Sequence, residues 1–476
     1  MRQASAGVRA VHDFVRARSP SGTHARVPLR NGTSFGAVQS RGDRLHQEDT
    51  YSVSCVQLPC EQLRQDVGRC TRPDDAARAP WNSWSCEQAG GEELGGQVVW
   101  AACFDGHGGG SVSALLRDKL QRIFEAVEPD MVTDTVEYTR SIGGYFRRFN
   151  GGVLEPWVRR DVLKPPPPRL PRQPPKKEAA PSEEVPKTLA ELVQGANRPT
   201  PPLHQAERKT EPPLSHFVAL AEDALSDQPT TRRIEPPKEM RGRLLTMEQR
   251  ATLACLMLDR EVQQNPQYRG AGSTASVLCM HSLDVPSAPW YASEFVAVTS
   301  IHLGDTRFLL CSTADGTAVP LTRAHHPDEE SESARLRRVG AAVVTDSFGE
   351  VRFMGQVANT RAFGDTAYKR LGVTAEPEVV SHVIEGDAFA FAIGFSDGVN
   401  DVLTDQEIVD LCRGAGHPSE AARRVINFAE DVGSEDNCTA ICVPLRGWGK
   451  IGGQDTTRDR REYRLSVSEV NRRDLR

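Results

Sequence analysis

The stretch Val98-Val-Trp-Ala-Ala-Cys-Phe-Asp-Gly-His-Gly-Gly-Gly110 decides how the rest of the chain is organised. Its first seven residues are apolar without a break, which predicts a strand buried on both faces. The run ends at Asp105 and His107, among glycines that leave the backbone free to turn. Apolar residues then recur at helical spacing from 112 to 127. We expect a carboxylate and an imidazole on a glycine-lined turn between strand and helix, although such a turn alone is equally typical of a simple loop.

The composition limits the class of protein. The 476 residues are enough for one large domain with additional loose segments, and the net charge of −6 gives no argument for a nucleic-acid partner. No apolar run approaches the roughly 18–20 residues that a membrane span needs. We therefore expect a soluble protein with no membrane span and no nucleic-acid partner.

The eleven cysteines are odd in number and form no CxxC unit. Four lie in apolar, strand-like runs and are predicted to be reduced core residues: Cys103, Cys279, Cys311 and Cys442. Four others are spaced too irregularly to favour a zinc site: Cys55, Cys60, Cys70 and Cys86.

Residues 1–33 are rich in arginine and contain a single acid, Asp13. Apolar residues at 8, 11, 14 and 15 are spaced as one face of a helix. This pattern is typical of a mitochondrial targeting leader, which places the protein in the matrix or intermembrane space. The alternative is a basic N-terminal segment that carries no targeting signal, in a cytoplasmic protein.

Three further segments differ from a globular core. Residues 57–97 are polar and rich in Gly, Pro and Trp, and are predicted to be a long surface loop. Residues 165–240 hold more than half of the prolines, which predicts a disordered insertion, or alternatively a Pro-rich ligand for an aromatic groove. Residues 446–476 carry nine Lys/Arg against five acids and are predicted to form a basic, loose tail.

The rest of the chain predicts alternating strands and helices. A capping box at Thr246 opens a helix to about 261, and Thr404 opens another that Gly414 closes. Gly304-Asp305 resembles a hairpin turn between neighbouring strands. Strands are expected near 35–38, 51–56, 272–280, 295–301, 307–311, 389–395 and 438–445, and a further helix at 418–430.

Acidic residues end several of these strands. They are Glu48 with Asp49, Asp105, Asp397 and Asp436, with Asp305 and Asp401 as further candidates. Converging carboxylates repel each other strongly unless a cation lies among them, and an oxygen-only ligand set suits Mg²⁺ or Mn²⁺. Spacing alone does not prove that these acids converge.

Eight motifs in order make the sequence resemble the metal-dependent Ser/Thr protein phosphatases of type 2C, with fungal mitochondrial members as a weaker match. The resemblance spans 34–445 and implies an α+β fold, in which two antiparallel β-sheets form a central sandwich flanked by α-helices. The motifs are Arg44-x-x-x-Glu48-Asp49, Asp105-Gly-His-Gly-Gly109, Gly272-Ser-Thr-Ala275, Leu303-Gly-Asp-Thr-Arg307, Leu321-Thr322 with His325 and Pro327, Arg361-Ala-Phe-Gly-Asp365, Ser396-Asp-Gly-Val-Asn-Asp401 and Asp436-Asn437.

The resemblance also implies hydrolysis of phosphoserine and phosphothreonine in proteins by a metal-activated water, without a phosphoenzyme. Two Mn²⁺ or Mg²⁺ ions are implied, with a possible third. His107 is implied as the acid that protonates the leaving oxygen, Arg44 as the phosphate ligand and Asp49 as the residue that orients metal-bound water. The implied metal ligands are Glu48, Asp105, the carbonyl of Gly106, Asp397 and Asp436, with Asp305 and Asp401 at the weaker third position.

One departure from the family pattern is Ala324, which replaces an acid after Leu321-Thr322 and puts the neighbouring flap in doubt. Every implied metal-ligand position is filled, which favours an active phosphatase over a pseudo-phosphatase that only binds a partner. A phosphatase of small phosphate esters is a third possibility. We expect a monomer.

Overall fold

The computed structural model describes residues 12–18, 22–70, 80–142, 152–158, 231–339, 343–345, 351–353 and 357–474. All of them belong to one compact unit, made from the two parts of the chain on either side of residues 164–230. Most of the predicted Pro-rich insertion lies outside the described residues.

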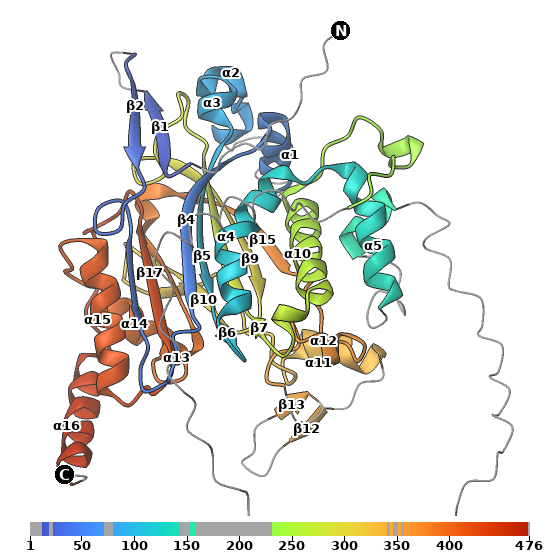
Figure 1. Cartoon of the computed structure of the whole chain (residues 1–476). Helices are drawn as coiled ribbons and strands as arrows, with labels where there is room; N and C mark the ends of the chain where they lie inside the picture. Colours follow the sequence, from blue (N-terminus) through green and yellow to red (C-terminus); the bar gives the residue numbers. More distant parts are fainter. Residues whose placement is uncertain are drawn as a thin grey trace, which may run out of the picture. The chain divides into compact units, whose positions relative to one another are not determined.

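Two five-stranded antiparallel sheets form the centre of this unit (Figure 1). The predicted sandwich is therefore confirmed. The first sheet has the order β15 (Glu378–Glu385), β9 (Phe295–Leu303), β8 (Ala275–Ser282), β5 (Gln97–Phe104) and β4 (Thr50–Gln57). The second has the order β11 (Ala318–Pro320), β10 (Arg307–Ser312), β16 (Phe389–Phe395), β17 (Cys438–Pro444) and β3 (Gly36–Ser40).

Strand β5 shows how the layers are held together, because it is buried along its whole length. Successive side chains of a strand point to opposite faces of the sheet. Trp100 and Phe104 pack into a core shared with helices, whereas Val99 and Ala101 pack into a core shared with the second sheet. An unbroken apolar run is what a strand between two apolar layers requires.

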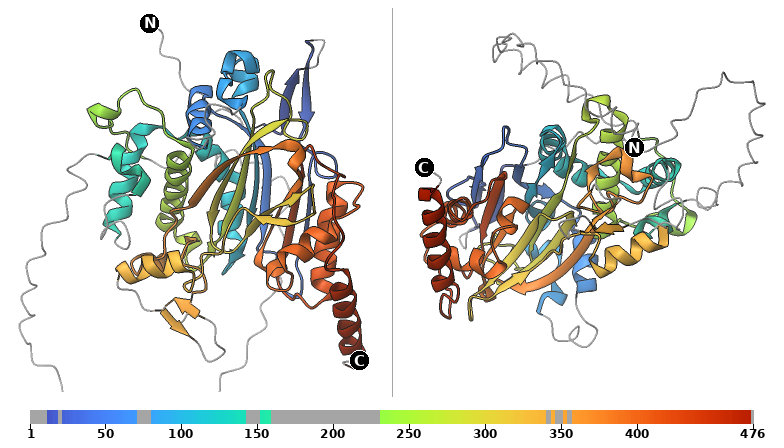
Figure 2. Two further views of the ribbon diagram at one scale, coloured as in Figure 1. Left: turned by 180° about the vertical axis from the view of Figure 1, so that it is seen from behind. Right: turned by 90° about the horizontal axis from the view of Figure 1, so that it is seen from below.

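Helices cover the outer face of each sheet (Figures 1 and 2). On the first sheet lie α4 (Ser111–Ala126) and α10 (Met247–Gln264), with α5 (Val132–Ser141) packed against α10. On the second lie α14 (Asp405–Leu411) and α15 (Pro418–Asp431), preceded by the short helix α13 (Asp397–Asn400). The capping boxes predicted at Thr246 and Thr404 are both formed.

The predicted surface loop at 57–97 is wrong in part. It contains α1 (Cys60–Cys70), α2 (Cys86–Ala89) and α3 (Glu92–Gly95). Leu63 and Val67, four residues apart on α1, and Trp84 are buried in the core beneath the helices. The amphipathic spacing was present, but the high content of Gly and polar residues obscured it.

The hairpin predicted at Gly304-Asp305 is also wrong. Strands β9 and β10 lie in different sheets, where β9 pairs with β8 and β15, and β10 pairs with β11 and β16. The turn therefore carries the chain from one sheet to the other. An apolar–turn–apolar pattern does not distinguish these two connections.

The predicted leader overlaps a β hairpin of β1 (Phe14–Arg18) and β2 (His24–Pro28). The helical face expected at Phe14 and Val15 is therefore not formed there. Val15 is 4% exposed and packs in the core between the sheets. The Arg16 amide donates to Gln97 Oε1 at 2.6 Å, and Gln97 Nε2 donates back to the Arg16 carbonyl at 3.0 Å.

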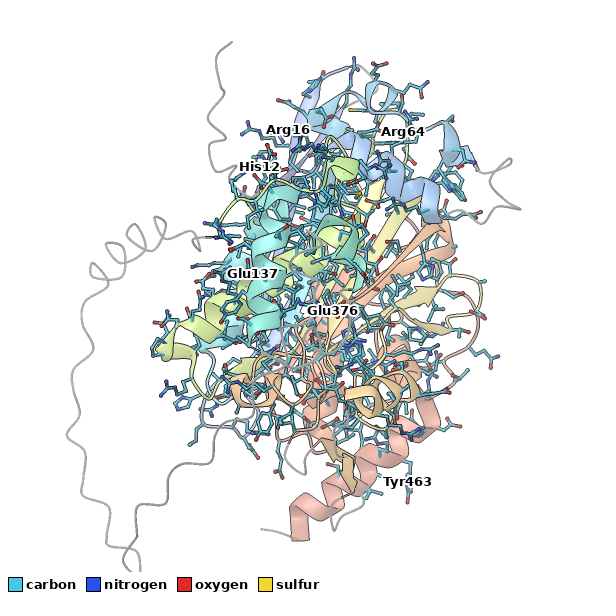
Figure 3. All side chains as sticks on the ribbon, turned by 90° about the vertical axis from the view of Figure 1, so that its right-hand side faces the viewer. His12, Arg16, Arg64, Glu137, Glu376 and Tyr463 are labelled. Atoms are coloured by element: carbon cyan, nitrogen blue, oxygen red, sulfur yellow. The ribbon has the colours of Figure 1, made fainter. Side chains whose placement is uncertain are left out.

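The C-terminal segment is more ordered than a loose tail, because it forms α16 (Arg458–Asp474). Arg464 donates to the carboxylate of Glu407, which is fully buried. In Figure 3, Tyr463 of α16 lies at the opposite end from Arg16 of β1 and from His12, which precedes β1. None of the helices among the described residues is long and apolar enough to cross a membrane.

The four cysteines that were predicted to be reduced core residues fit that expectation. Cys103, Cys279, Cys311 and Cys442 are buried and free. Each is in a strand of the sandwich.

The end of the predicted insertion, from residue 231, packs on α5, where Arg232 pairs with Glu137.

Candidate active site

Three of the predicted acids converge at one end of the sandwich. Asp105 follows β5, Asp305 follows β9 and Asp397 begins α13 directly after β16. One carboxylate oxygen from each lies within 4.8 Å of the others. Because β5 and β9 belong to one sheet and β16 to the other, the sandwich itself brings these carboxylates together.

The carboxylates have the properties of a metal-ligand set. Asp105 Oδ2 and Asp305 Oδ1 are buried and have no hydrogen-bond partner among the described residues. Burial, reinforced by the neighbouring carboxylates, raises the pKa of Asp105 far above its usual range. Burial, together with the charge of Asp305, raises the pKa of Asp397 to about 8. A divalent cation relieves this repulsion, and the oxygen-only donors suit Mg²⁺ or Mn²⁺.

Asp49 is fixed beside this cluster. Its Oδ2 accepts hydrogen bonds from Ser396 Oγ at 2.7 Å and Thr439 Oγ1 at 2.8 Å. Burial raises the pKa of Asp49 to about 6, despite these hydrogen bonds. Thr439 lies on β17 and Ser396 directly follows β16, so Asp49, which precedes β4, connects the two sheets at the site.

Asn437 positions the segment that carries Arg44 and Glu48. Its Oδ1 accepts the Glu48 amide at 2.7 Å, and its Nδ2 donates to the carbonyls of Arg41 and His46. Arg44 pairs with Asp436 at 2.5 Å. Glu48 and Asp436 thus border the cluster but lie outside the three-carboxylate group.

Glu48 lies against Gly106, because a Cβ on Gly106 would be 2.5 Å from the Glu48 carbonyl oxygen. Asp401, at the end of α13, is exposed, and its charge helps to raise the pKa of Asp397. Asp305 Oδ2 accepts a hydrogen bond from Asn359 Nδ2 at 2.7 Å. All of the predicted site residues therefore lie in or around one region.

His107 is held by a small three-stranded sheet of β14 (Phe363–Gly364), β7 (Gly272–Ser273) and β6 (Gly106–His107). This sheet brings His107 Nε2 to 3.0 Å from the carboxylate of Asp365. A Cβ on Gly272 would be 2.4 Å from His107 Nε2 and 2.9 Å from the Phe363 carbonyl oxygen, so a side chain there would displace the imidazole. Asp365 raises the pKa of His107, although burial opposes this shift.

The backbone of Asp365 is in the left-handed region, with φ of 48°, which is uncommon for a residue other than glycine. The preceding Gly364 amide donates to Asp259 Oδ1 at 2.9 Å. Lys369 pairs with the same carboxylate at 3.1 Å and donates to the Ala362 carbonyl at 2.6 Å. These buried contacts anchor the turn that presents Asp365 to His107.

The segment that contains Ala324 is held against the Gly304 turn by the next residue, His325. The His325 amide donates to the Gly304 carbonyl at 2.8 Å, and the Gly304 amide donates to His325 Nδ1 at 3.0 Å. His325 also stacks on His302, with ring centroids 4.6 Å apart. This pair supports the turn that carries Asp305.

Sequence reasoning gave no role to Asn359 or Asp365. Asp365 ends the Arg361–Asp365 motif, and Asn359 lies two residues before it. The motif was a signal that this segment belongs to the site. The partners of both residues are distant in sequence, so spacing could not reveal them.

Comparisons with known proteins show which proteins this chain is similar to. Residues 222–438 match the family model of protein phosphatase 2C. Protein phosphatase 2C homolog 4 of Schizosaccharomyces pombe is 41% identical over 205 residues, which cover 43% of this chain and 53% of that protein. The mitochondrial protein phosphatase 1K of Xenopus laevis is 37% identical over 148 residues, which cover 31% of this chain and 39% of that protein.

The chain thus spans about half or less of the length of these two curated relatives. Among solved structures, the serine-threonine phosphatase 2C of Toxoplasma gondii aligns over 92% of this chain and 98% of its own. Its TM-score is 0.43 and its identity is 15%.

Proposed function

We propose that this chain, whose residues 222–438 match the family model of protein phosphatase 2C, is a metal-dependent protein serine/threonine phosphatase. The observation that carries the proposal is the convergence of Asp105, Asp305 and Asp397 within 4.8 Å, with buried oxygens that lack partners among the described residues. Such a ligand set needs a cation and matches the chemistry of the family.

Asp105, Asp397, Asp436, Glu48 and the carbonyl of Gly106 are proposed to hold two Mn²⁺ or Mg²⁺ ions. Asp305 and Asp401 are proposed at a weaker third position. When bound, such ions supply Lewis-acid stabilisation of a phosphoryl oxygen and a water of lowered pKa. The position of Asp305 inside the tight carboxylate group favours its direct participation in metal binding.

The remaining residues bind substrate and move protons. Arg44 is largely exposed, and its guanidinium can exchange its pairing with Asp436 for the two oxygens of a substrate phosphate. His107 is also partly exposed and is proposed to protonate the leaving oxygen of serine or threonine, which leaves poorly as an alkoxide. Asp49 is proposed to orient the attacking water.

The test is dephosphorylation of a phosphothreonine peptide by the full chain, with Mn²⁺ or Mg²⁺ and then with EDTA. We expect metal-dependent turnover that falls by at least about 100-fold in Asp105→Asn and Asp397→Asn. Asp118→Asn is the matched control, since it removes an exposed acid on α4 that pairs only with its neighbour Arg117 among the described residues.

A folded, metal-loaded protein without turnover would contradict the proposal. That result would favour the alternative, a pseudo-phosphatase that binds phosphoproteins. Equal turnover in all three variants would exclude the carboxylate cluster as the catalytic centre.

We propose a mitochondrial location, supported by the arginine-rich residues 1–33 and the mitochondrial relative. Import of a fluorescent protein fused to residues 1–33 into isolated mitochondria tests this location, and a fusion protein that stays outside the mitochondria contradicts it. The substrates are proposed to be phosphorylated proteins, and the chain a monomer, which light scattering on the purified protein can check.

A further inference from the structure

Three short helices between β4 and β5 carry a second group of potential metal ligands. Helices α1, α2 and α3 gather at the end of the sandwich opposite to β6 and α13 (Figure 1). Arg64 marks α1 in Figure 3. Helices α2 and α3 have four residues each and are separated by the left-handed glycines 90 and 91.

The group consists of Cys60 at the start of α1, Cys86 at the start of α2 and Glu92 at the start of α3. One donor atom from each lies within 4.8 Å of the others. In a tetrahedral zinc site with Zn–S bonds of about 2.3 Å, ligand atoms lie roughly 3.5–4 Å apart. Small side-chain adjustments therefore suffice to close this group around one ion.

The surroundings hold the three ligands in place. The Cys60 amide donates to Glu92 Oε2 at 3.2 Å, which fixes the carboxylate next to the thiol. Cys60 is 2% exposed, and a Cβ on Gly95 would be only 3.2 Å from its sulfur. The two thiols and the carboxylate thus already face one another.

We propose that Cys60, Cys86 and Glu92 bind one Zn²⁺ ion that ties α1, α2 and α3 together. Two thiolates and a carboxylate are a ligand set suited to zinc rather than to Mg²⁺ or Mn²⁺. Binding releases the two thiol protons to solvent and forms two Zn–S bonds and one Zn–O bond. Helices of four residues bury little apolar surface, so a metal crosslink supplies stability that the hydrophobic core cannot supply there.

The fourth position of this site is assigned to water. His281 is not part of the group, and its Nε2 bonds the Gly95 carbonyl at 2.9 Å. Cys86 is half-buried and Glu92 is exposed, so the open position faces solvent. Three protein ligands and one water complete a tetrahedral zinc shell, which is the arrangement of open, catalytic-type zinc sites.

The proposed zinc site is separate from the carboxylate cluster. Strand β5 runs between them, from Gln97 next to α3 to Phe104 next to Asp105. Eight extended residues span roughly 25 Å. The zinc proposal therefore stands whether or not the chain is a phosphatase.

The test is Co²⁺ binding to the full-length, reduced protein, because Co²⁺ replaces Zn²⁺ and reports its ligands spectroscopically. We expect a thiolate-to-cobalt charge-transfer band at about one equivalent, abolished by equimolar Zn²⁺. Carboxylate-bound cobalt at the active site gives no such band. Cys86→Ser should abolish the band, and Glu92→Gln should weaken cobalt affinity about tenfold.

Glu87→Gln is the matched control, since Glu87 is the exposed acid next to Cys86, and it should change nothing. Cys86 is only half-buried, so its variant should fold even if Cys60→Ser does not. Absence of the band in the reduced protein overturns the proposal. So does a band that persists unchanged in Cys86→Ser, or a Cys60–Cys86 disulfide in the purified protein whose reduction restores no metal binding.

Discussion

Asp365 connects the turn that follows β14 to the proposed acid of the reaction. Its carboxylate lies 3.0 Å from His107 Nε2, which leaves Nδ1 as the ring nitrogen available to a substrate. A carboxylate on one nitrogen fixes the tautomer and orientation of the ring. Asp365 is therefore a positioning residue for His107.

We expect Asp365→Ala to lower kcat for a phosphothreonine peptide by roughly tenfold or more. The threonine alkoxide of this substrate needs a proton to leave, and His107 without Asp365 is poorly oriented to donate it. Turnover of p-nitrophenyl phosphate should change far less, since nitrophenolate leaves without one. Steady-state kinetics on both substrates measure the difference, with Asp118→Asn as control. An equal loss on both substrates would indicate general disruption of the site instead.

We expect the carboxylate cluster to destabilise the protein in the absence of metal. Asp105, Asp305 and Asp397 are close, and burial intensifies their repulsion. We expect Asp105→Asn to raise the melting temperature of the metal-free protein and to remove most of the rise that Mn²⁺ causes in the unchanged protein. Thermal scans with and without Mn²⁺ measure both effects.

For comparison, Asp118→Asn should leave both melting temperatures unchanged. If Asp105→Asn lowered the melting temperature of the metal-free protein, repulsion among these carboxylates would not be the dominant effect at this site.

Three of the acids that the sequence singled out, Asp105, Asp305 and Asp397, come together in the structure, and each lies just after a strand. The sequence could not identify which of the acids are closest. Asp305 was assigned to the weaker metal position, yet it lies in the tight group, whereas Asp436 pairs with Arg44. These distances depend on side-chain directions and on pairing between residues far apart in sequence.

At the scale of secondary structure elements, the β1–β2 hairpin places part of the predicted leader in the folded core. Val15 packs between the sheets, and Leu29, just after β2, is buried in the same core. Asn31 extends this contact, because it exchanges two hydrogen bonds with the backbone of Ala37 on β3. Removal of residues 1–33 therefore exposes the edge of the sandwich.

We expect a chain that begins at residue 34 to lose at least about 3 kcal/mol of unfolding free energy, from the lost burial of two aliphatic side chains. Val15→Ala in the full chain should lose about 2 kcal/mol, and Ala25→Ser on the exposed face of β2 almost nothing. Urea unfolding measures all three. If the shortened chain is as stable as the full one, the hairpin is dispensable and a leader boundary at 33 is favoured.

Elements with a strong local pattern were predictable. Elements that depend on contacts with distant parts of the chain were not. The unbroken run of β5 and the capping boxes of α10 and α14 specify their structure locally. Helices α2 and α3 are too short to show a period. The basic segment that forms α16 is fixed by the pairing of Arg464 with buried Glu407, a contact that lies 57 residues away in sequence.

At the scale of the whole molecule, the sequence indicated a sandwich only through its resemblance to a family. Strand order within each sheet mixes the start and end of the chain, as when β3 pairs with β17. Local patterns contain no information about such pairing. The consequence is that the site, formed where the two sheets meet, depends on the stability of the complete unit.

That stability should depend on pH through the buried histidines. Burial lowers the pKa of His281 to about 4, and also lowers the pKa values of His302 and His325. In the unfolded chain a histidine binds a proton near pH 6.5. Between pH 6.5 and 4 the unfolded state therefore binds more protons, so the stability contributed by His281 is complete above pH 6.5 and is lost as the pH falls towards 4.

We expect His281→Gln, which can still donate to the Gly95 carbonyl, to remove this part of the pH dependence. Relative to pH 7, the unchanged protein should lose roughly 2 kcal/mol more than the variant at pH 5, as measured by urea unfolding at both pH values. His382→Gln, at an exposed position on β15, is the control and should behave like the unchanged protein. Parallel losses in the unchanged protein and His281→Gln would mean that acid destabilisation comes from other groups, with the His302–His325 pair beneath the Asp305 turn as the next to examine.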